Sequence, residues 1–185
     1  MNVLATKLPG VLVIDPAVFD DARGFFMESF HAKRYAEAGI TGSFIQDNIS
    51  LSRRGVLRGL HTQHPHGQGK LTYVLQGEVF DVAVDVRVGS PTFGDWVGEY
   101  LSQENRRQLY VPPGFAHGFL VTSDEALFAY KCTDYYHPEA ERSVCWDDPR
   151  IGIEWPMRDV SLSAKDRDAV ALRAMPPELL PRYTP

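Results

Sequence analysis

The sequence from position 79 to 87 reads Val79-Phe-Asp-Val-Ala-Val-Asp-Val-Arg87 and alternates strictly between two sets of side chains. One set is wholly apolar and consists of Phe80, Val82, Val84 and Val86. The other set is mixed and consists of Asp81, Ala83, Asp85 and Arg87. Successive side chains of a β-strand point to opposite faces, so this period of two predicts a strand with one face against a hydrophobic core.

Short strand-like segments continue on both sides of this stretch. Turn residues separate most of them, among them Gly55, Gly77 and the triplet Pro112-Pro-Gly114. The expected strands cover residues 44–47, 56–61, 71–76, 95–101, 107–111, 117–122, 126–133 and 143–146. About eight short strands at this spacing predict an all-β fold, a sandwich or barrel of the jelly-roll type, with a few short helices.

Helical signals are few. Ser29 can cap a helix over residues 30–38 that Gly39 would end, and a second short helix is expected over 164–174. The region after about residue 150 is rich in proline. We expect residues 1–185 to form a single domain in which this last region wraps the barrel.

Composition narrows the function classes. The chain has 185 residues with 19 Lys and Arg against 24 Asp and Glu, a formal net charge of −5, which argues against nucleic-acid or anionic-membrane partners. Its two cysteines are too few for a disulfide framework. The N-terminus does not resemble a signal peptide, and no apolar run approaches the roughly 18 residues of a membrane span. A cytoplasmic location is expected.

Polar side chains are concentrated between positions 46 and 70. The spacing of His61, Gln63 and Lys70, together with His117 in Pro112-Pro-Gly-Phe-Ala-His117, resembles the two motifs of the cupin superfamily. Cupins hold a metal at these four positions, with histidine and glutamate. Because a lysine ammonium repels a divalent cation, we expect a cupin jelly roll without a metal. His64 and His66, in a loop rich in proline and glycine, offer replacement ligands, but loop histidines are more often solvated.

Eight runs in order resemble the dTDP-4-dehydrorhamnose 3,5-epimerase family. They are Gln46-Asp-Asn-Ile-Ser50, Gly55-Val-Leu-Arg-Gly-Leu-His61, Gln68-Gly-Lys-Leu71, Phe80-Asp-Val-Ala-Val-Asp85, Ser90-Pro-Thr-Phe-Gly94, Pro113-Gly-Phe-Ala-His-Gly-Phe119, Tyr130-Lys131 and Leu162-Ser-Ala-Lys-Asp166. The resemblance implies inversion of carbons 3 and 5 of dTDP-4-dehydro-6-deoxy-D-glucose in dTDP-L-rhamnose biosynthesis. It also implies no cofactor, and a homodimer whose N-terminal strands join the partner's sheet.

The resemblance assigns roles to four residues. His61 resembles the general base, Asp166 would pair with its far ring nitrogen, and Tyr130 resembles the general acid. Lys70 would lie near the ketone oxygen, where its charge stabilises an enolate. From the sequence alone, Asp81 rivals Asp166 as the partner of His61.

Further positions match substrate-binding residues of the family. Arg58 and His117 match the sugar pocket, and Tyr136 matches an aromatic side chain that stacks on thymine, with Tyr135 as its neighbouring alternative. The remaining matched binding positions are Arg23, Glu28, Gln46, Asp47, Asn48, Glu141 and Lys165.

Three rival functions stay open at this point. Relatives that invert one carbon only share much of the pattern, and Thr62 and the loop His64-Pro-His-Gly67 depart from the family's usual residues. A metal-dependent cupin oxygenase would need ligands at the positions of Gln63 and Lys70. A non-catalytic sugar-nucleotide-binding cupin would need no acid and base.

Overall fold

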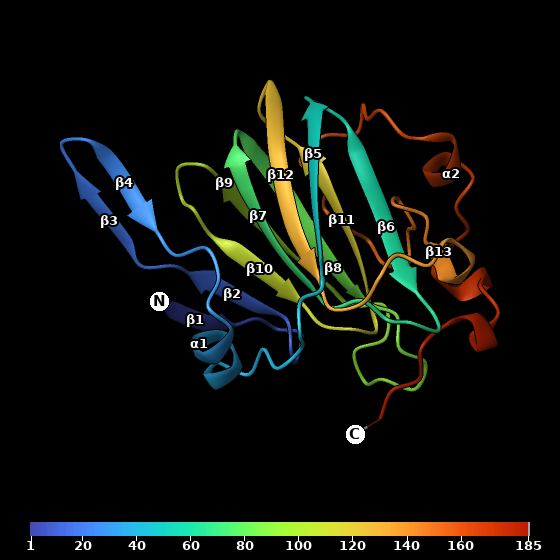
Figure 1. Cartoon of the computed structure of the whole chain (residues 1–185). Coiled ribbons are helices and arrows are strands. Elements are labelled where there is room, and N and C mark those ends of the chain that lie inside the picture. Colours follow the sequence, from blue (N-terminus) through green and yellow to red (C-terminus); the bar gives the residue numbers. More distant parts are fainter. Residues whose placement is uncertain (185) are drawn as a thin grey trace.

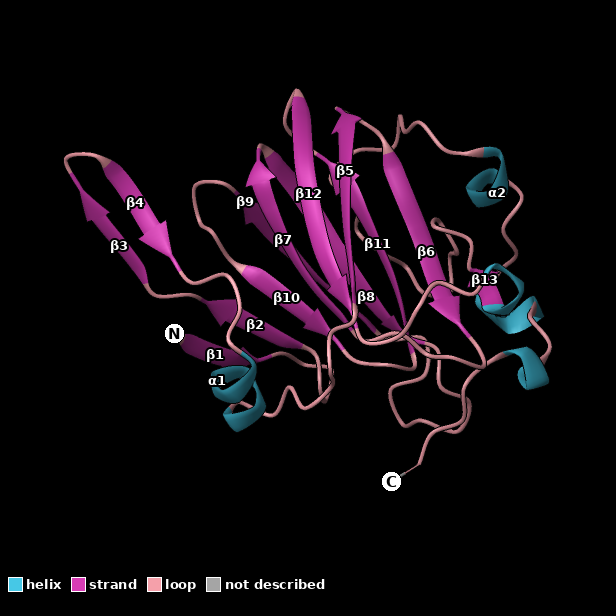
Figure 2. Ribbon diagram, in the orientation of Figure 1, coloured by secondary structure: helices cyan, strands magenta, loops and turns pink. Residues whose placement is uncertain are grey.

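The computed structural model describes residues 1–184, and its main elements are two antiparallel β-sheets (Figures 1 and 2). The six-stranded sheet has the order β1 (Asn2–Ala5), β2 (Leu12–Asp15), β10 (Gln108–Val111), β7 (Lys70–Gln76), β12 (Glu125–Cys132), β5 (Gln46–Arg53). The five-stranded sheet has the order β13 (Glu141–Ser143), β6 (Leu57–Gln63), β11 (Phe115–Val121), β8 (Glu78–Asp85), β9 (Trp96–Ser102). The prediction of an all-β cupin jelly roll is confirmed.

Strand β8 carries the alternating stretch and is covered on both faces. Val79 and Ala83 pack into the core between the sheets. Phe80, Val82 and Val84 pack into a second apolar cluster on the other side of the five-stranded sheet. Both faces of the strand are therefore buried, and even its aspartates, Asp81 and Asp85, are inaccessible to solvent.

The second apolar cluster is closed by the last part of the chain. Ile151, Ile153 and Trp155 are buried there, and Leu172 and Leu180 follow. Their burial removes the outer face of β8 and its neighbours from water, which favours folding by about 1.5–3 kcal/mol per large side chain. The same segment carries a short helix that forms one wall of the pocket described below.

The two predicted helices are shorter than expected. Helix α1 (Ala32–Glu37) is capped by His31, whose ring accepts a hydrogen bond from the Arg34 amide, and not by Ser29. The carbonyl of Ser29 is occupied elsewhere, by the hydroxyl of Tyr35. Helix α2 (Ala164–Arg167) ends early because the chain becomes extended after it, and Val170 pairs with Val144, the residue that follows β13. A separate 3-10 turn, Leu172–Ala174, follows.

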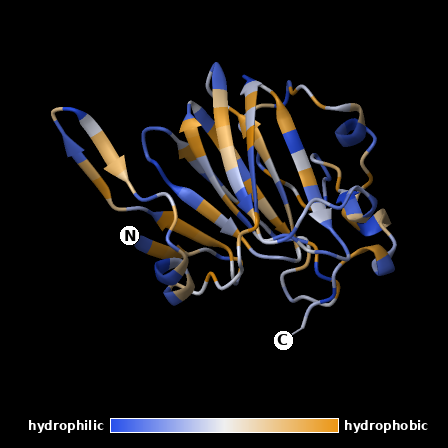
Figure 3. Cartoon of the chain, in the orientation of Figure 1, coloured by the Kyte–Doolittle hydropathy of each residue, from blue (hydrophilic) through white to orange (hydrophobic). Residues whose placement is uncertain are grey.

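The sequence patterns missed the N-terminal strands. Besides β1 and β2, a hairpin of β3 (Val18–Asp21) and β4 (Gly24–Met27) extends away from the two sheets (Figure 1). Its aromatic side chains are open to solvent: Phe19 is 63% exposed and Phe26 is 69% exposed. Figure 3 shows apolar colour along β4 and at the start of β3, and a hydrophilic tip between them.

Two predicted strand positions need correction. The strand expected at 44–47 is β5, which begins at Gln46 and continues to Arg53, and the one expected at 143–146 is β13, which ends at Ser143. No helix among residues 1–184 is long and apolar enough to cross a membrane.

Candidate active site

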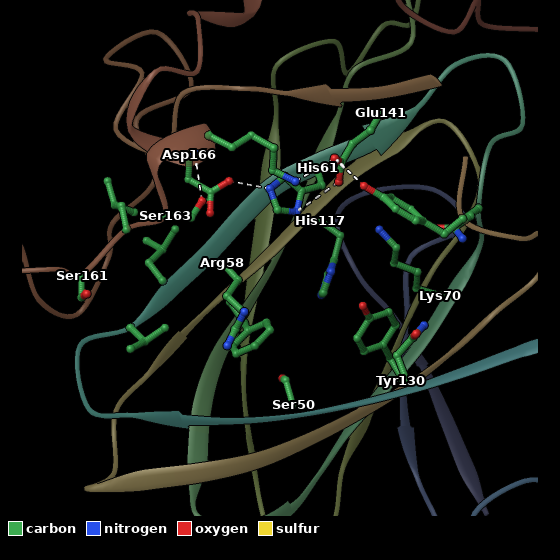
Figure 4. A pocket seen from close by; sticks show the side chains of 18 of the residues that line it. Ser50, Arg58, His61, Lys70, His117, Tyr130, Glu141, Ser161, Ser163 and Asp166 are labelled. Carbon is green, nitrogen blue, oxygen red and sulfur yellow. Dashed lines mark hydrogen bonds and ion pairs between the residues drawn. The ribbon is translucent and has the colours of Figure 1, made fainter. Parts of the chain in front are cut away.

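A pocket of about 720 Å³ lies between the two sheets (Figure 4). The six-stranded sheet lines it with side chains from β5, β7 and β12. The five-stranded sheet lines it from β6 and β11, and the segment 161–166 closes one side. The pocket brings together eleven of the residues that the sequence singled out: Gln46, Asn48, Arg58, His61, Lys70, His117, Tyr130, Tyr136, Glu141, Lys165 and Asp166.

His61, on β6, is fixed by a carboxylate behind it. Its Nε2 lies 2.6 Å from Oδ1 of Asp166, which is only 3% exposed. Burial alone would raise the pKa of the Asp166 carboxyl, but the hydrogen bond and the charge of His61 outweigh burial and hold that pKa below its usual range. With a proton on Nε2 to donate to this carboxylate, the neutral ring keeps its lone pair on Nδ1.

Helix α2 positions Asp166. The Ser163 hydroxyl accepts a hydrogen bond from the Asp166 amide at 3.1 Å, the N-cap contact that starts the helix. This cap sets the first turn of α2 against β6, so the carboxylate reaches His61 from the side of the pocket that this segment closes. Figure 4 shows the carboxylate and the ring facing each other.

A second histidine–carboxylate pair lies deeper in the sandwich. His117 on β11 pairs with Asp81 on β8, with 2.6 Å between Nε2 and Oδ1. The Thr72 hydroxyl donates to the other oxygen of Asp81, also at 2.6 Å. The structure thereby decides between the two candidate partners of His61: Asp166 contacts it, and Asp81 is occupied by His117.

Tyr130 and Lys70 lie on the opposite wall, on the neighbouring strands β12 and β7. Burial raises the pKa of the Tyr130 phenol, so the hydroxyl keeps its proton at neutral pH. Burial also lowers the pKa of the Lys70 ammonium, against the opposing attraction of Cys132, Glu141 and Asp81. A lysine held in this way carries its charge in a poorly solvated place, where an anion benefits most from it.

Glu141 organises the rim next to His61. Its Oε2 accepts hydrogen bonds from Lys165 at 2.7 Å and from the Tyr136 hydroxyl at 3.1 Å. Burial would raise the pKa of Glu141, but Lys165 and the charge of His61 hold it below its usual range. Both neighbouring tyrosines are exposed, at 59% for Tyr135 and 50% for Tyr136, but of the two only Tyr136 lines the pocket.

The rest of the polar lining comes from alternating positions of β5 and from β6. Gln46, Asn48 and Ser50 face the pocket because they are two residues apart on one strand face. Arg58 reaches across from β6 and donates to the Ser52 hydroxyl at 3.1 Å and 3.0 Å. This wall presents amides and a guanidinium, which are donors for an anionic or oxygen-rich ligand.

Three predicted binding residues lie outside the pocket of the single chain. Asp47 points to the other face of β5 and forms an ion pair with Lys131 at 2.9 Å, as the alternation of the strand requires. Arg23 lies at the tip of the exposed hairpin and pairs with Asp21. Glu28, just after the hairpin, pairs with Arg34.

Several pocket residues were missed by sequence reasoning. Ser50 was missed because the strand was expected to end at Asp47. Ser161, Leu162 and Ser163 line the pocket from a loop, and only the Ser163-x-x-Asp166 spacing of a helix cap signals that a helix begins there.

The pocket does not fit a cupin metal. Gln63, at one ligand position, is turned toward the rim, where its amide donates to the backbone carbonyls of His66 and Tyr135. His61 and His117 each already pair with a carboxylate, and the Lys70 ammonium occupies another ligand position. The donor set suits proton transfer and anion binding.

The geometry places a histidine base and a protonated tyrosine on opposite walls, with an ammonium group on the tyrosine's side. Removal of a proton next to a carbonyl needs a base and a cation for the developing enolate oxygen, and inversion needs a proton donor on the far face. The pocket holds each of these groups.

Comparison with known proteins gives the family. The model of the dTDP-4-dehydrorhamnose 3,5-epimerase family matches residues 5–174. The Shigella flexneri dTDP-4-dehydrorhamnose 3,5-epimerase is 57% identical over 168 residues, 90% of this chain and 93% of the relative. The enzyme of that name from Methanothermobacter thermautotrophicus is 52% identical over 176 residues, 94% of this chain and 95% of the relative.

A solved structure agrees with these sequences. The dTDP-6-deoxy-D-glucose-3,5-epimerase of Legionella pneumophila, in complex with dTDP-4-keto-L-rhamnose, superposes with a TM-score of 0.97. It is 57% identical and covers 100% of this chain and 99% of its own. The resemblance predicted from the sequence is confirmed: the chain belongs to the dTDP-4-dehydrorhamnose 3,5-epimerase family.

Proposed function

We propose that the chain inverts carbons 3 and 5 of dTDP-4-dehydro-6-deoxy-D-glucose, without a cofactor, in the biosynthesis of dTDP-L-rhamnose. The observation that carries the proposal is the position of His61 and Tyr130 on opposite walls of one pocket, with Lys70 beside Tyr130. A base and an acid on opposite faces of a sugar ring are what inversion needs and what binding alone does not need.

The proposed chemistry runs twice, once at each carbon. His61 Nδ1 takes the proton, the C–H electron pair becomes the C=C bond of an enolate, and the ketone oxygen takes the negative charge beside Lys70. Tyr130 then delivers a proton to the opposite face and the ketone re-forms. The imidazolium and the phenolate return to their starting states by proton exchange before the second carbon reacts.

Asp166 supports His61 in this scheme as a positioning residue. The carboxylate holds the ring by Nε2 and stabilises the imidazolium that forms when Nδ1 takes the proton. Lys70 contributes more to the enolate than to the ketone, because the oxygen gains charge during the reaction.

The nucleotide part of the substrate is assigned to the rim and to β5. Lys165 is a cation on the pocket lining and suits the diphosphate, whereas Arg58 keeps the place in the sugar pocket that the resemblance implies. Gln46, Asn48 and Tyr136 offer amides and an aromatic face for a thymine base.

We also propose that the chain works as a homodimer. Strand β5 is the outer strand of the six-stranded sheet, and on its outward face Ile49 is 66% exposed and Leu51 is 60% exposed. The apolar edge strand and the exposed aromatic side chains of the β3–β4 hairpin both need cover. A second copy would satisfy both and would bring the partner's Arg23 and the partner's Glu28 to the pocket.

Mixed subunits test the dimer. Arg23→Ala and His61→Asn chains, each inactive or nearly so, are combined under conditions of subunit exchange. In a shared-site dimer about half of the dimers are mixed and one of their two sites is intact, so about a quarter of the parental activity returns. No recovery in confirmed mixed dimers would show that Arg23 serves the site of its own chain, and full activity of the Arg23→Ala chain alone would show that Arg23 serves no site.

We further propose that residues 1–185 form one domain, since the tail buries its apolar residues against the five-stranded sheet. A cytoplasmic location is proposed with it. Cys132 and Cys145 are unpaired thiols, which fits a reducing compartment.

The test of the function is an NMR spectrum of the product made from dTDP-4-dehydro-6-deoxy-D-glucose. Inversion at both carbons is the expected result. Inversion at carbon 3 alone or at carbon 5 alone would make the chain a single-carbon epimerase, and binding without turnover would make it a binding module. Either outcome overturns the proposal.

A further inference from the structure

The rim of the pocket carries a cluster of metal-ligating side chains that the proposed reaction does not use. Among residues 1–184, His66, Asp134 and His137 form the one group of three such side chains whose ligand atoms all lie within 4.8 Å of one another. The rings of His66 and His137 are stacked, with 4.1 Å between their centroids and an angle of 18° between their planes. Oδ2 of Asp134 lies 3.8 Å from Nδ1 of His66.

The backbone of the cluster is held in place by a buried amide. Gln63, 5% exposed, donates to the carbonyl of His66 at 2.7 Å and to the carbonyl of Tyr135 at 3.1 Å. Its Oε1 accepts from the amide of His137 at 2.8 Å. One side chain therefore sets the spacing between the loop after β6 and the segment after β12, which bear the two histidines.

A second set of contacts orients the carboxylate. Gln68 donates to the carbonyl of Asp134 at 2.9 Å. The amide of Tyr135 donates to Oδ1 of Asp134 at 2.8 Å, which leaves Oδ2 turned toward His66. Hydrogen bonds of this kind, which fix a ligand from outside, accompany metal ligands in known sites.

We propose that His66, Asp134 and His137 bind one divalent cation of the zinc class. Two imidazoles and one carboxylate are a donor set that Zn²⁺ accepts, with a fourth position left for water. A tetrahedral zinc ion keeps its ligand atoms about 3.4 Å apart, so these atoms must close by at most about 1.4 Å from the 4.8 Å limit, and rotation of the partly exposed rings supplies this movement. Oε1 of Glu139 lies 3.3 Å from Nδ1 of His137. Glu139 can give up this contact, which frees Nδ1 for the ion, or it can bind the ion as a further oxygen ligand.

The site lies beside the reaction centre and not within it. Gln68 and Tyr136, on the two segments that the cation would join, line the pocket, whereas none of the three ligands does. The bound ion fastens the loop 64–69 to the segment 133–137 at the pocket's edge. The proposed reaction itself uses no metal.

The test is calorimetric titration of the untagged, chelator-stripped chain with ZnCl₂. One ion per chain is expected. His66→Asn, Asp134→Asn and His137→Gln should each weaken binding at least about tenfold, because even outer-shell partners of metal ligands are worth about 10–100-fold. Asn at position 66 keeps a residue that tolerates the positive φ of 67° found there, and Asn at position 134 can keep the bond from Tyr135.

The matched control is His31→Asn, which removes a distant histidine but retains a helix-capping side chain. It should bind Zn²⁺ as the parent does, and circular dichroism checks the fold of every variant. In nitrogen NMR of the six histidines, Zn²⁺ should shift the ring signals of His66 and His137. Substoichiometric binding, equal affinity in a His66→Asn/His137→Gln double variant, or shifts confined to His61 and His117 would overturn the proposal.

Discussion

Replacement of Asp166 by asparagine isolates the charge behind the proposed base. Asparagine has the same shape and can still accept a hydrogen bond from His61 Nε2 through its carbonyl oxygen. The change therefore removes the negative charge and leaves the pocket's shape intact. It should lower kcat, since the imidazolium that forms when His61 takes the proton loses its counter-charge.

The size of the effect follows from the geometry. The bond is 2.6 Å long and the carboxylate is 3% exposed, so solvent screens it little. A hydrogen bond to a charged group is worth about 1.5–3 kcal/mol. Two unit charges about 4 Å apart at an effective dielectric of about 20 attract by about 4 kcal/mol. A loss of about 1.5–4 kcal/mol of barrier stabilisation is a fall of about 10- to 1,000-fold in kcat.

The assay is steady-state kinetics with the product quantified by NMR. KM should change less than about threefold, because Asp166 contacts Nε2 of His61 whereas the proposed mechanism uses Nδ1 on the substrate. Asp168→Asn is the matched control, with the same charge change on an exposed residue at the end of α2. A kcat for Asp166→Asn within about threefold of that for Asp168→Asn would refute the argument that the charge supports the base.

Three further predictions concern Lys70, metal removal and Asp85. Lys70→Ala should lower kcat more than it raises KM, by about 2.7–4 kcal/mol of barrier; a change in KM alone would refute its role. In the parent, kcat should accordingly fall as pH rises through the lowered pKa of Lys70, before Tyr130, whose pKa is raised, loses its proton. Exhaustive chelation should leave kcat unchanged, and a turnover that needs added metal would contradict the chemistry. Asp85→Ala should lower the free energy of unfolding in urea by about 3–5 kcal/mol at pH 7, since it leaves the buried end of Arg87 without a partner. Burial would raise the pKa of Asp85, but bonds from Arg87, Ser90 and Thr92 lower it, so this stabilisation is present above about pH 4 and is lost as pH falls through the folded-state pKa.

The sequence predicted the sandwich because its middle strands carry strong patterns. Val79 to Arg87 alternates without a break, and glycine or proline separates it from its neighbours. The N-terminal strands were missed because each has four residues, too few for a clear period. The length of helix α2 was overestimated because the residues after Arg167 have adequate helix propensity. In the structure the chain is extended there, since Val170 pairs with Val144.

The pocket was predicted in part for similar reasons. His61, Lys70 and Tyr130 lie on regular strands, so their motif positions translate into places on a sheet. The choice between Asp166 and Asp81 needed the fold, because a carboxylate 105 positions away in sequence reaches His61 only through the tail. Arg23 lies on the β3–β4 hairpin and Glu28 directly after it. The hairpin extends away from the two sheets, so the pattern of one chain does not indicate what these two side chains contact.

The proposed mechanism depends most on Tyr130 as the acid, and proton NMR of the Tyr130→Phe enzyme with substrate in deuterated water tests that role most directly. His61 remains, so deuterium should enter carbon 3 or carbon 5 faster than the inverted product forms. The His61→Asn enzyme, run alongside, should show neither exchange nor product. Inverted product made by Tyr130→Phe at the parental rate would contradict the mechanism, since the acid would then be another residue.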